Sequence, residues 1–218
     1  MTYTGDVVVG GAPDVRELPG LRITKVATPP FDNNCYLLRC TATGETLLVD
    51  AAGDAPRLLE LVGDGILTTV VETHGHWDHV QALAEVVAAT GARVLAHIGD
   101  AGDLPVTPDQ LLSDGDTLRV GEVELTAIHL IGHTPGSLAL LYAGDPDAPH
   151  LWSGDSLFPG GPGNTEKDAS RFTSLMDDLE AKVFGRLPDA TWVYPGHGKD
   201  TTLGAERPSL SEWRERGW

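Results

Sequence analysis

The chain has 218 residues, of which 41% are hydrophobic and 22% are charged, with 26 Gly and 15 Pro; this composition indicates a globular protein with many short elements and excludes a disordered chain or a long helical rod. Fifteen Lys and Arg against 32 Asp and Glu give a net charge of −17, which argues against nucleic acid or an anionic membrane surface as a partner. Without a run of about 20 apolar residues or the basic flank of a signal peptide, we expect a soluble, cytoplasmic protein.

Short apolar runs, rich in branched residues and bounded by Gly, Asp, Asn or Pro, predict strands along most of the chain. In chain order they cover residues 21–26, 35–38, 46–49, 66–71, 93–96, 123–129, 138–142, 151–152 and 192–193. Residues 115–131 also have the pattern of a hairpin, and 160–163 read as a loop. Cys35 and Cys40 are too few for a disulfide scaffold, so we expect two buried thiols.

Helical spacing is clearest in two places. Val80, Leu83 and Val87 form a stripe that ends at Gly91, and a second stripe runs from Phe172 to Val183, with Gly185 after it. A shorter helix follows Pro56. Strands interleaved with helices favour an α/β sandwich. We expect a single domain over residues 1–218, in which 206–218 form a polar C-terminal tail whose Trp213 and Trp218 pack on the body.

The strongest local signal is a cluster of three histidines and an aspartate directly after the strand predicted at 66–71. It comprises His74, His76, Asp78 and His79, a pattern expected by chance in about one in a thousand sequences of this composition. Gly75 favours an extended loop, in which residues two apart share a face, so His74 and His76 can reach one ion. Asp78 and His79 project differently and could serve a second ion, although Asp78 alone is also explained as a helix N-cap.

Three further segments each place one ligand-type residue in a turn of small residues after a predicted strand. They contain His133 in Gly-His-Thr-Pro-Gly, Asp155 in Ser-Gly-Asp-Ser, and His197 in Tyr-Pro-Gly-His-Gly. Small residues let the backbone approach an ion and let side chains converge. Each segment alone is equally explained as an ordinary surface turn. Together with the first cluster they give five histidines and two carboxylates, all in loops.

This ordered set resembles the metallo-β-lactamase fold hydrolases, and within them the glyoxalase II-like group, over about residues 21–199. The sequences of the segments from Asp32 to Leu37 and from Gly132 to Ser137 are also similar to that group. The resemblance implies a four-layer αβ/βα sandwich with a metal site along one edge of its sheets. It implies that His74, His76 and His133 hold one metal, that Asp78, His79 and His197 hold a second, and that Asp155 and a water or hydroxide bridge them.

The ligand set also favours a type of ion and a type of reaction. Without Cys among the ligands, two divalent ions of borderline or hard character are expected, zinc first, with iron or manganese as alternatives. A bound water whose pKa is lowered to about 7 would supply a hydroxide nucleophile, which Asp78 could also orient. A thiolate with a free pKa near 8.5 leaves without obligatory protonation, which favours thioesters over lactams. The hypothesis is therefore a binuclear hydrolase of a small thioester or ester.

Other readings stay open on the sequence alone. A persulfide dioxygenase is similar but uses one iron held by two histidines and an aspartate; a lactonase, a β-lactamase or a non-catalytic metal-binding module are further alternatives. Glyoxalase II proteins usually carry a C-terminal helical domain that contacts glutathione, whereas 21 residues follow His197 here, so the thiol carrier is open, as is the oligomeric state. Trp77 could line the mouth of the site and stack on substrate, and Lys199 could attract a substrate carboxylate.

Overall fold

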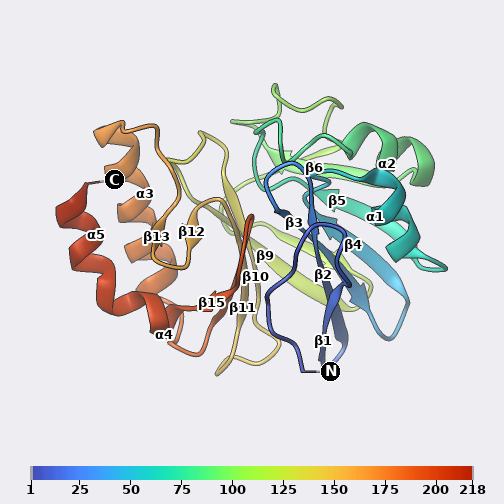
Figure 1. Cartoon of the computed structure of the whole chain (residues 1–218), viewed down its shortest axis with the longest axis horizontal. Coiled ribbons are helices and arrows are strands. Elements are labelled where there is room, and N and C mark those ends of the chain that lie inside the picture. The colour runs from blue at the N-terminus through green and yellow to red at the C-terminus, as the bar shows by residue number, and fades with distance from the viewer. Residues whose placement is uncertain (1, 218) are drawn as a thin grey trace.

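The computed structural model describes residues 2–217, and it has two mixed sheets packed face to face with helices on both outer sides (Figure 1). The first sheet has the order β1-β2-β3-β4-β5-β6-β7. Its strands are Asp14–Leu18, Leu21–Thr28, Asn33–Cys40, Glu45–Val49, Ile66–Val71, Arg93–His97 and Gln110–Leu112. Strands β1 to β4 pair antiparallel, and β4 to β7 pair parallel.

The second sheet has the order β15-β14-β11-β10-β9-β8. In chain order its strands are Thr117–Val120, Val123–His129, Leu138–Tyr142, His150–Gly154, Trp192–Pro195 and Thr201–Thr202. Pairing is antiparallel except between β11 and β14, which run parallel. A small ribbon of β12, Leu157–Phe158, and β13, Gly161–Pro162, lies where the sequence predicted only a loop at 160–163.

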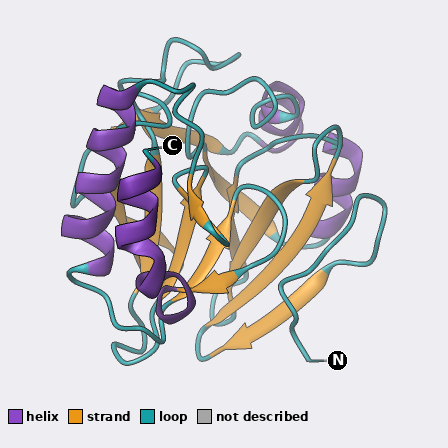
Figure 2. Cartoon of the chain, turned by 60° about the vertical axis from the view of Figure 1, so that its left-hand side comes forward, coloured by secondary structure: helices purple, strands orange, loops and turns teal. Residues whose placement is uncertain are grey.

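Three apolar clusters hold the four layers together. Residues from the inner faces of both sheets, such as Ile23, Leu38, Leu125 and Trp152, form the central core. The other two clusters lie outside the sheets, under α1 and α2 on one side and under α3 and the C-terminal helices on the other. Figure 2 shows helices at both flanks of the strands. The predicted αβ/βα sandwich is therefore confirmed, and burial of these apolar faces is what drives the layers together.

Local sequence features explain where the main helices begin or end. In α1, Ala55–Val62, the Asp54 side chain caps the backbone N–H of Arg57 and Pro56 lies in the first turn. Helix α2, Leu83–Thr90, ends at Gly91 in the left-handed conformation, as the sequence predicted. Helix α3, Ala169–Asp178, is capped by Asp168 and continues as a π-helical segment, Leu179–Phe184.

The segment predicted as a polar tail is mostly helical. It follows α4, Leu203–Glu206, and contains a 3-10 turn, Arg207–Ser209, and α5, Leu210–Arg216. Trp213 packs on the body of the protein as expected and is 1% exposed, whereas Trp218 lies outside the described residues. The sequence predicted a polar tail packed on the body but did not predict its helices; one buried aromatic and a few apolar neighbours suffice to dock a short helix. None of the helices in residues 2–217 is long and apolar enough to cross a membrane.

Candidate metal centre

The predicted ligands lie in loops that follow the C-terminal ends of four strands. His74, His76, Asp78 and His79 follow β5, and the remaining three, His133, Asp155 and His197, follow β9, β11 and β14. Strands β9, β11 and β14 share a direction, since β10 is antiparallel to both β9 and β11. Their carboxyl ends therefore meet at one edge of the second sheet, facing the end of β5.

The structure brings these side chains together in two groups. Ligand atoms of His74, His76 and His133 lie within 4.8 Å of one another, with His133 Nε2 only 3.0 Å from His76 Nδ1. Ligand atoms of Asp78, His79 and His197 form the second group within the same limit. Nitrogen ligands of one tetrahedral zinc, each at about 2.0 Å from the ion, lie about 3.3 Å apart. Each group is therefore compact enough for one ion.

Asp155 lies between the two groups. Its Oδ1 is 3.5 Å from His79 Nε2, and its Oδ2 is 3.4 Å from His197 Nε2 and 3.6 Å from His133 Nε2. One carboxylate thus faces nitrogens from both groups. This is the position that a bridging ligand requires.

Asp50, which follows β4, fixes two of the rings. Its Oδ2 lies 3.0 Å from His79 Nδ1 and accepts a hydrogen bond of 2.8 Å from the Thr73 hydroxyl. Because a carboxylate only accepts, His79 Nδ1 carries the proton. The Thr73 hydroxyl, having donated to Asp50, accepts from His74 Nδ1 at 3.0 Å. Both rings consequently direct the lone pair of Nε2 toward the centre.

Backbone carbonyls fix the tautomers of two further rings. His133 Nδ1 donates to the Asn164 carbonyl at 2.8 Å, and His197 Nδ1 donates to the Phe31 carbonyl at 3.0 Å. Their Nε2 lone pairs also face inward. His76 differs, since its Nδ1 faces His133 Nε2. Five imidazoles therefore offer lone pairs to a common space, which is an arrangement for holding cations.

Two buried atoms in this space have no hydrogen-bond partner among residues 2–217. They are His74 Nε2 and Asp155 Oδ1, and His74 is 2% exposed. Buried polar atoms without partners are costly and uncommon in folded proteins. Metal ions between the groups would satisfy both. The residues present therefore fit two divalent cations, and their nitrogen and oxygen donors suit zinc, iron or manganese.

The electrostatics of the centre favour added positive charge. Burial and the neighbouring His79 hold the pKa of His74 well below its ordinary value, which keeps this ring neutral. Burial alone would also lower the pKa of His79, but the Asp155 and Asp50 carboxylates raise it to about 9. Despite burial, the facing histidines hold the pKa of Asp155 well below its usual range. The carboxylates thus form a buried negative site that a proton or a metal ion neutralises.

Other residues hold the ligand loops in place, and sequence reasoning missed them. Asp100 accepts from the Gly75 and Gly136 amides, at 3.0 and 2.7 Å, and from the Thr134 hydroxyl at 2.5 Å. It thereby joins the loop of His76 to the loop of His133. Asn33 Nδ2 donates to Asp78 Oδ2 at 2.9 Å. The positions of Asp50 and Asp100 just after predicted strands are a signal that could have identified them.

The structure decides between the two readings of Asp78. Helix α2 begins at Leu83 and its N-cap is Ala82, without a side-chain bond. Asp78 instead lies 3.7 Å from His197 Nε2 and 3.9 Å from His79 Nε2. The alternative that Asp78 is only a helix cap is therefore wrong.

The two predicted substrate residues lie in different surroundings. Trp77 is 60% exposed and contacts Phe31 edge to face, with ring centroids 5.8 Å apart. The backbone carbonyl of Phe31 accepts the hydrogen bond from His197 Nδ1. Lys199 Nζ lies 2.9 Å from Asp6 at the surface. Contact of either residue with substrate stays a prediction.

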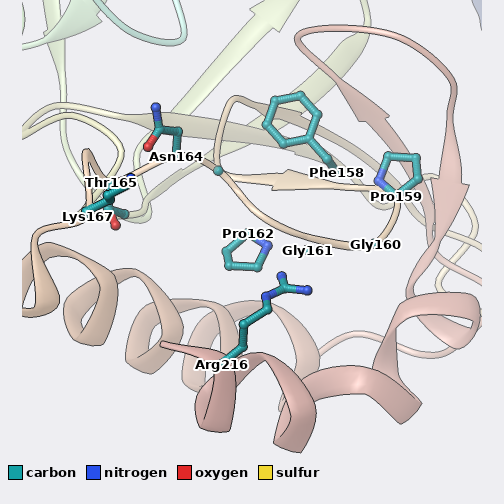
Figure 3. A pocket seen from close by; sticks show the side chains of 10 residues that line it. Phe158, Pro159, Gly160, Gly161, Pro162, Asn164, Thr165, Lys167 and Arg216 are labelled. Carbon is teal, nitrogen blue, oxygen red and sulfur yellow. The ribbon is translucent and has the colours of Figure 1, made fainter. Parts of the chain in front are cut away.

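Cavities adjoin the centre on two sides. One, of about 410 Å³, lies between the β12–β13 ribbon and α5, and Phe158, Asn164, Lys167 and Arg216 line it (Figure 3). Phe158 contacts His197, with ring centroids 6.3 Å apart. The other, of about 400 Å³, is lined by His76, Ile131 and Arg171. Both give a small molecule room beside the ligands.

Replacing Asp50 by Asn should weaken metal binding without emptying the centre. The asparagine side chain keeps the shape of the aspartate but lacks the negative charge of the oxygen that faces His79 Nδ1 and the Thr73 hydroxyl. Partners of this kind typically change metal affinity by about 10-fold to 100-fold. Chelator competition would measure the change. An unchanged affinity would show that Asp50 does not act on His79.

The model of the metallo-beta-lactamase superfamily matches residues 28–197. A hydroxyacylglutathione hydrolase of Polaromonas sp. strain JS666 is 37% identical over 169 residues, which are 77% of this chain and 62% of that protein. This chain therefore spans about six tenths of the length of that relative.

Two solved structures also share the fold. The crystal structure of ETHE1 from Myxococcus xanthus superposes with a TM-score of 0.76 at 28% identity, covering 88% of this chain and 84% of that one. A di-iron-bound form of TTHA1623 gives a TM-score of 0.67 at 31% identity, covering 84% and 96%. The fold and the centre define a four-layer sandwich protein with a histidine and aspartate metal site. The chain belongs to the metallo-beta-lactamase superfamily.

Proposed function

We propose that this protein is a binuclear metal-dependent hydrolase of small thioesters or esters, of the glyoxalase II type. The observation that carries the proposal is the convergence of seven side chains in two groups joined by Asp155. A purely structural metal site closes with four ligands around one ion. Here seven ligands for two ions would leave positions open for water and substrate. The hydroxyacylglutathione hydrolase relative supports the same reaction class.

The chain's own residues supply orientation and charge. Two divalent ions at these ligands would polarise a carbonyl and make water nucleophilic at neutral pH. Asp78, held by Asn33 at 2.9 Å, has a carboxylate that can accept a hydrogen bond from that water and orient it. The ring tautomers are fixed by Asp50, Thr73 and backbone carbonyls, so the ligands need little rearrangement during the reaction. A thiolate leaves without a proton, which makes a thioester the preferred substrate.

The flanking cavities suggest how the substrate lies. Lys167 lines the cavity beside Phe158, and its cationic side chain would favour an anionic thiol carrier in a chain whose net charge is −17. Trp77 and Phe31, whose rings contact each other, would offer an apolar surface to an acyl group. The expected substrates are thus acyl thioesters of small anionic thiols.

Metal analysis with a substrate panel tests the proposal. The protein as purified should hold two divalent ions per chain and hydrolyse S-lactoylglutathione or simpler acyl thioesters. Chelation should abolish turnover, and restoring zinc, iron or manganese in turn should identify the working ion. A protein loaded with two ions that hydrolyses no thioester, ester or lactone would contradict the proposal.

The likeness to ETHE1 favours one second candidate, a persulfide dioxygenase with a single iron. Two histidines and one aspartate would hold that iron, and His74, His133 and Asp155 include such a set. Oxygen consumption with glutathione persulfide, together with one iron per chain, would support it. Two ions per chain and thioester hydrolysis without oxygen uptake would exclude it.

A further inference from the structure

Lys25, on β2, is a lysine with no exposed surface in the middle of the protein. Its ammonium group makes three hydrogen bonds, to Asp200 Oδ1 at 2.6 Å, the Gly198 carbonyl at 2.7 Å and the Gly5 carbonyl at 2.8 Å. All three ammonium protons therefore have acceptors. A buried ion pair is stable only when its remaining polar groups are satisfied in this way, so the position of Lys25 is tightly fixed.

Two of the three groups that Lys25 holds, the Gly198 carbonyl and the Asp200 carboxylate, belong to the loop that carries His197, between β14 and β15. Asn34, on β3, donates from Nδ2 to two carbonyls of the same segment, those of Pro195 and Gly198, both at 2.9 Å. The Tyr36 hydroxyl donates to the Pro195 carbonyl at 2.6 Å. Side chains from the first sheet thus fix the backbone on both sides of His197, a ligand that belongs to the second sheet.

The N-terminal segment closes this network from outside. The Tyr3 hydroxyl donates to Asp200 Oδ2 at 2.6 Å, and Trp192 Nε1 donates to the same oxygen at 2.8 Å. The Asp200 amide donates to the Gly5 carbonyl at 3.2 Å. A Cβ on Gly5 would lie 2.6 Å from Asp200 Cγ, so only glycine allows so close an approach. Tyr3, Gly5 and Trp192 therefore contact Asp200, which lies on the loop that carries His197.

We propose that Lys25 and Asp200, covered by Tyr3, are positioning residues for His197, and that they set the affinity of the group of Asp78, His79 and His197 for its ion. In the group of His74, His76 and His133, the Thr73 hydroxyl holds His74 and the Asn164 carbonyl holds His133, and neither support belongs to the Lys25 network. Loosening the Lys25 network should therefore affect one ion and not the other. The proposal rests on the two-ion centre of the proposed function for its metal readout, but not for its readout in the metal-free protein.

Tyr3→Phe is the mildest test, because it removes one hydroxyl and leaves the ion pair. Tyr142→Phe is its matched control, since the Tyr142 hydroxyl donates to the Pro19 carbonyl in an exposed position. Zinc affinities of both ions would be measured by chelator competition. The expected result is about tenfold weaker binding of one ion in Tyr3→Phe, with the other unchanged and the control like the parent protein. Equal weakening of both ions, or of neither, would overturn the proposal.

A double variant, Lys25→Met with Asp200→Asn, removes both charges together and leaves no buried charge unpaired. One ion should bind about 100-fold more weakly. In the metal-free protein, hydrogen exchange of the segment 195–200 should accelerate while that of 73–79 stays unchanged. Unchanged exchange at 195–200 would overturn the proposal. If the double variant fails to fold, Tyr3→Phe decides by the same exchange measurement.

The exchange measurement also separates this proposal from the proposed function. A parent protein that binds a single ion would contradict the binuclear hydrolase. The exchange of segment 195–200 in the metal-free variants would still report whether the Lys25 network holds the His197 loop. A single ion in the parent protein would therefore overturn the proposed function, and unchanged exchange of segment 195–200 in the variants would overturn the positioning role of the Lys25 network.

Discussion

Replacing Asp155 by Ala is expected to release both ions and to lower kcat/KM for a thioester by about three orders of magnitude or more. Metal ions contribute several kcal/mol to the stabilisation of a hydrolytic transition state, and about 1.4 kcal/mol corresponds to tenfold in rate. Asp155 faces nitrogens of both groups, at 3.4 to 3.6 Å from His197, His79 and His133. Its loss removes the bridge and the negative charge that balances the cations.

Metal content by elemental analysis, taken with steady-state kinetics, measures this effect. Asp189→Ala is a suitable control, because that carboxylate is exposed and pairs with Arg207 at the surface. The control should keep both ions and full activity. Circular dichroism of the metal-free Asp155→Ala protein should resemble that of the parent, since Asp155 Oδ1 accepts no hydrogen bond from the part of the chain that the structure describes. Retention of two ions and of turnover in Asp155→Ala would refute the assignment of this residue.

The residues of the candidate centre could be selected from the sequence because each signal was local. Three histidines and an aspartate follow one strand within six residues, and His133, Asp155 and His197 each follow a strand in a turn of small residues. The apolar runs predicted β5, β9 and β10 with their observed bounds. Strand ends and turn chemistry are set by neighbouring residues, which a linear reading captures.

The supports of the ligands could not be predicted in the same way. Lys25 contacts Asp200 across 175 positions, and Asn33 contacts Asp78 across 45. Neither pair has a local pattern, because only the packing of the two sheets brings them together. Edge strands such as β1 and β7 and the short helix α5 were missed for a related reason. Their stability comes from neighbours in space, which override weak local preferences.

Replacing Gly196 by Ala should be nearly as damaging as loss of a ligand, although it removes no functional group. A Cβ at this position would overlap Asp155 Oδ1 and lie 2.9 Å from His79 Cε1. The φ angle of Gly196 is outside the left-handed region, so the backbone itself accepts alanine. The methyl group must therefore displace the bridging Asp155 and the ligand His79, and displacement of about 1 Å costs about 100-fold in rate.

Gly102→Ala provides the matched control, since no atom lies within 4 Å of a Cβ there and its backbone also lacks a positive φ. The expected result is weaker metal binding and an activity loss of about 100-fold in Gly196→Ala, with Gly102→Ala unchanged. Elemental analysis and kinetics on both proteins measure it. Because Gly196 carries no side chain, full metal content in Gly196→Ala would mean that Asp155 and His79 do not converge where the structure places them.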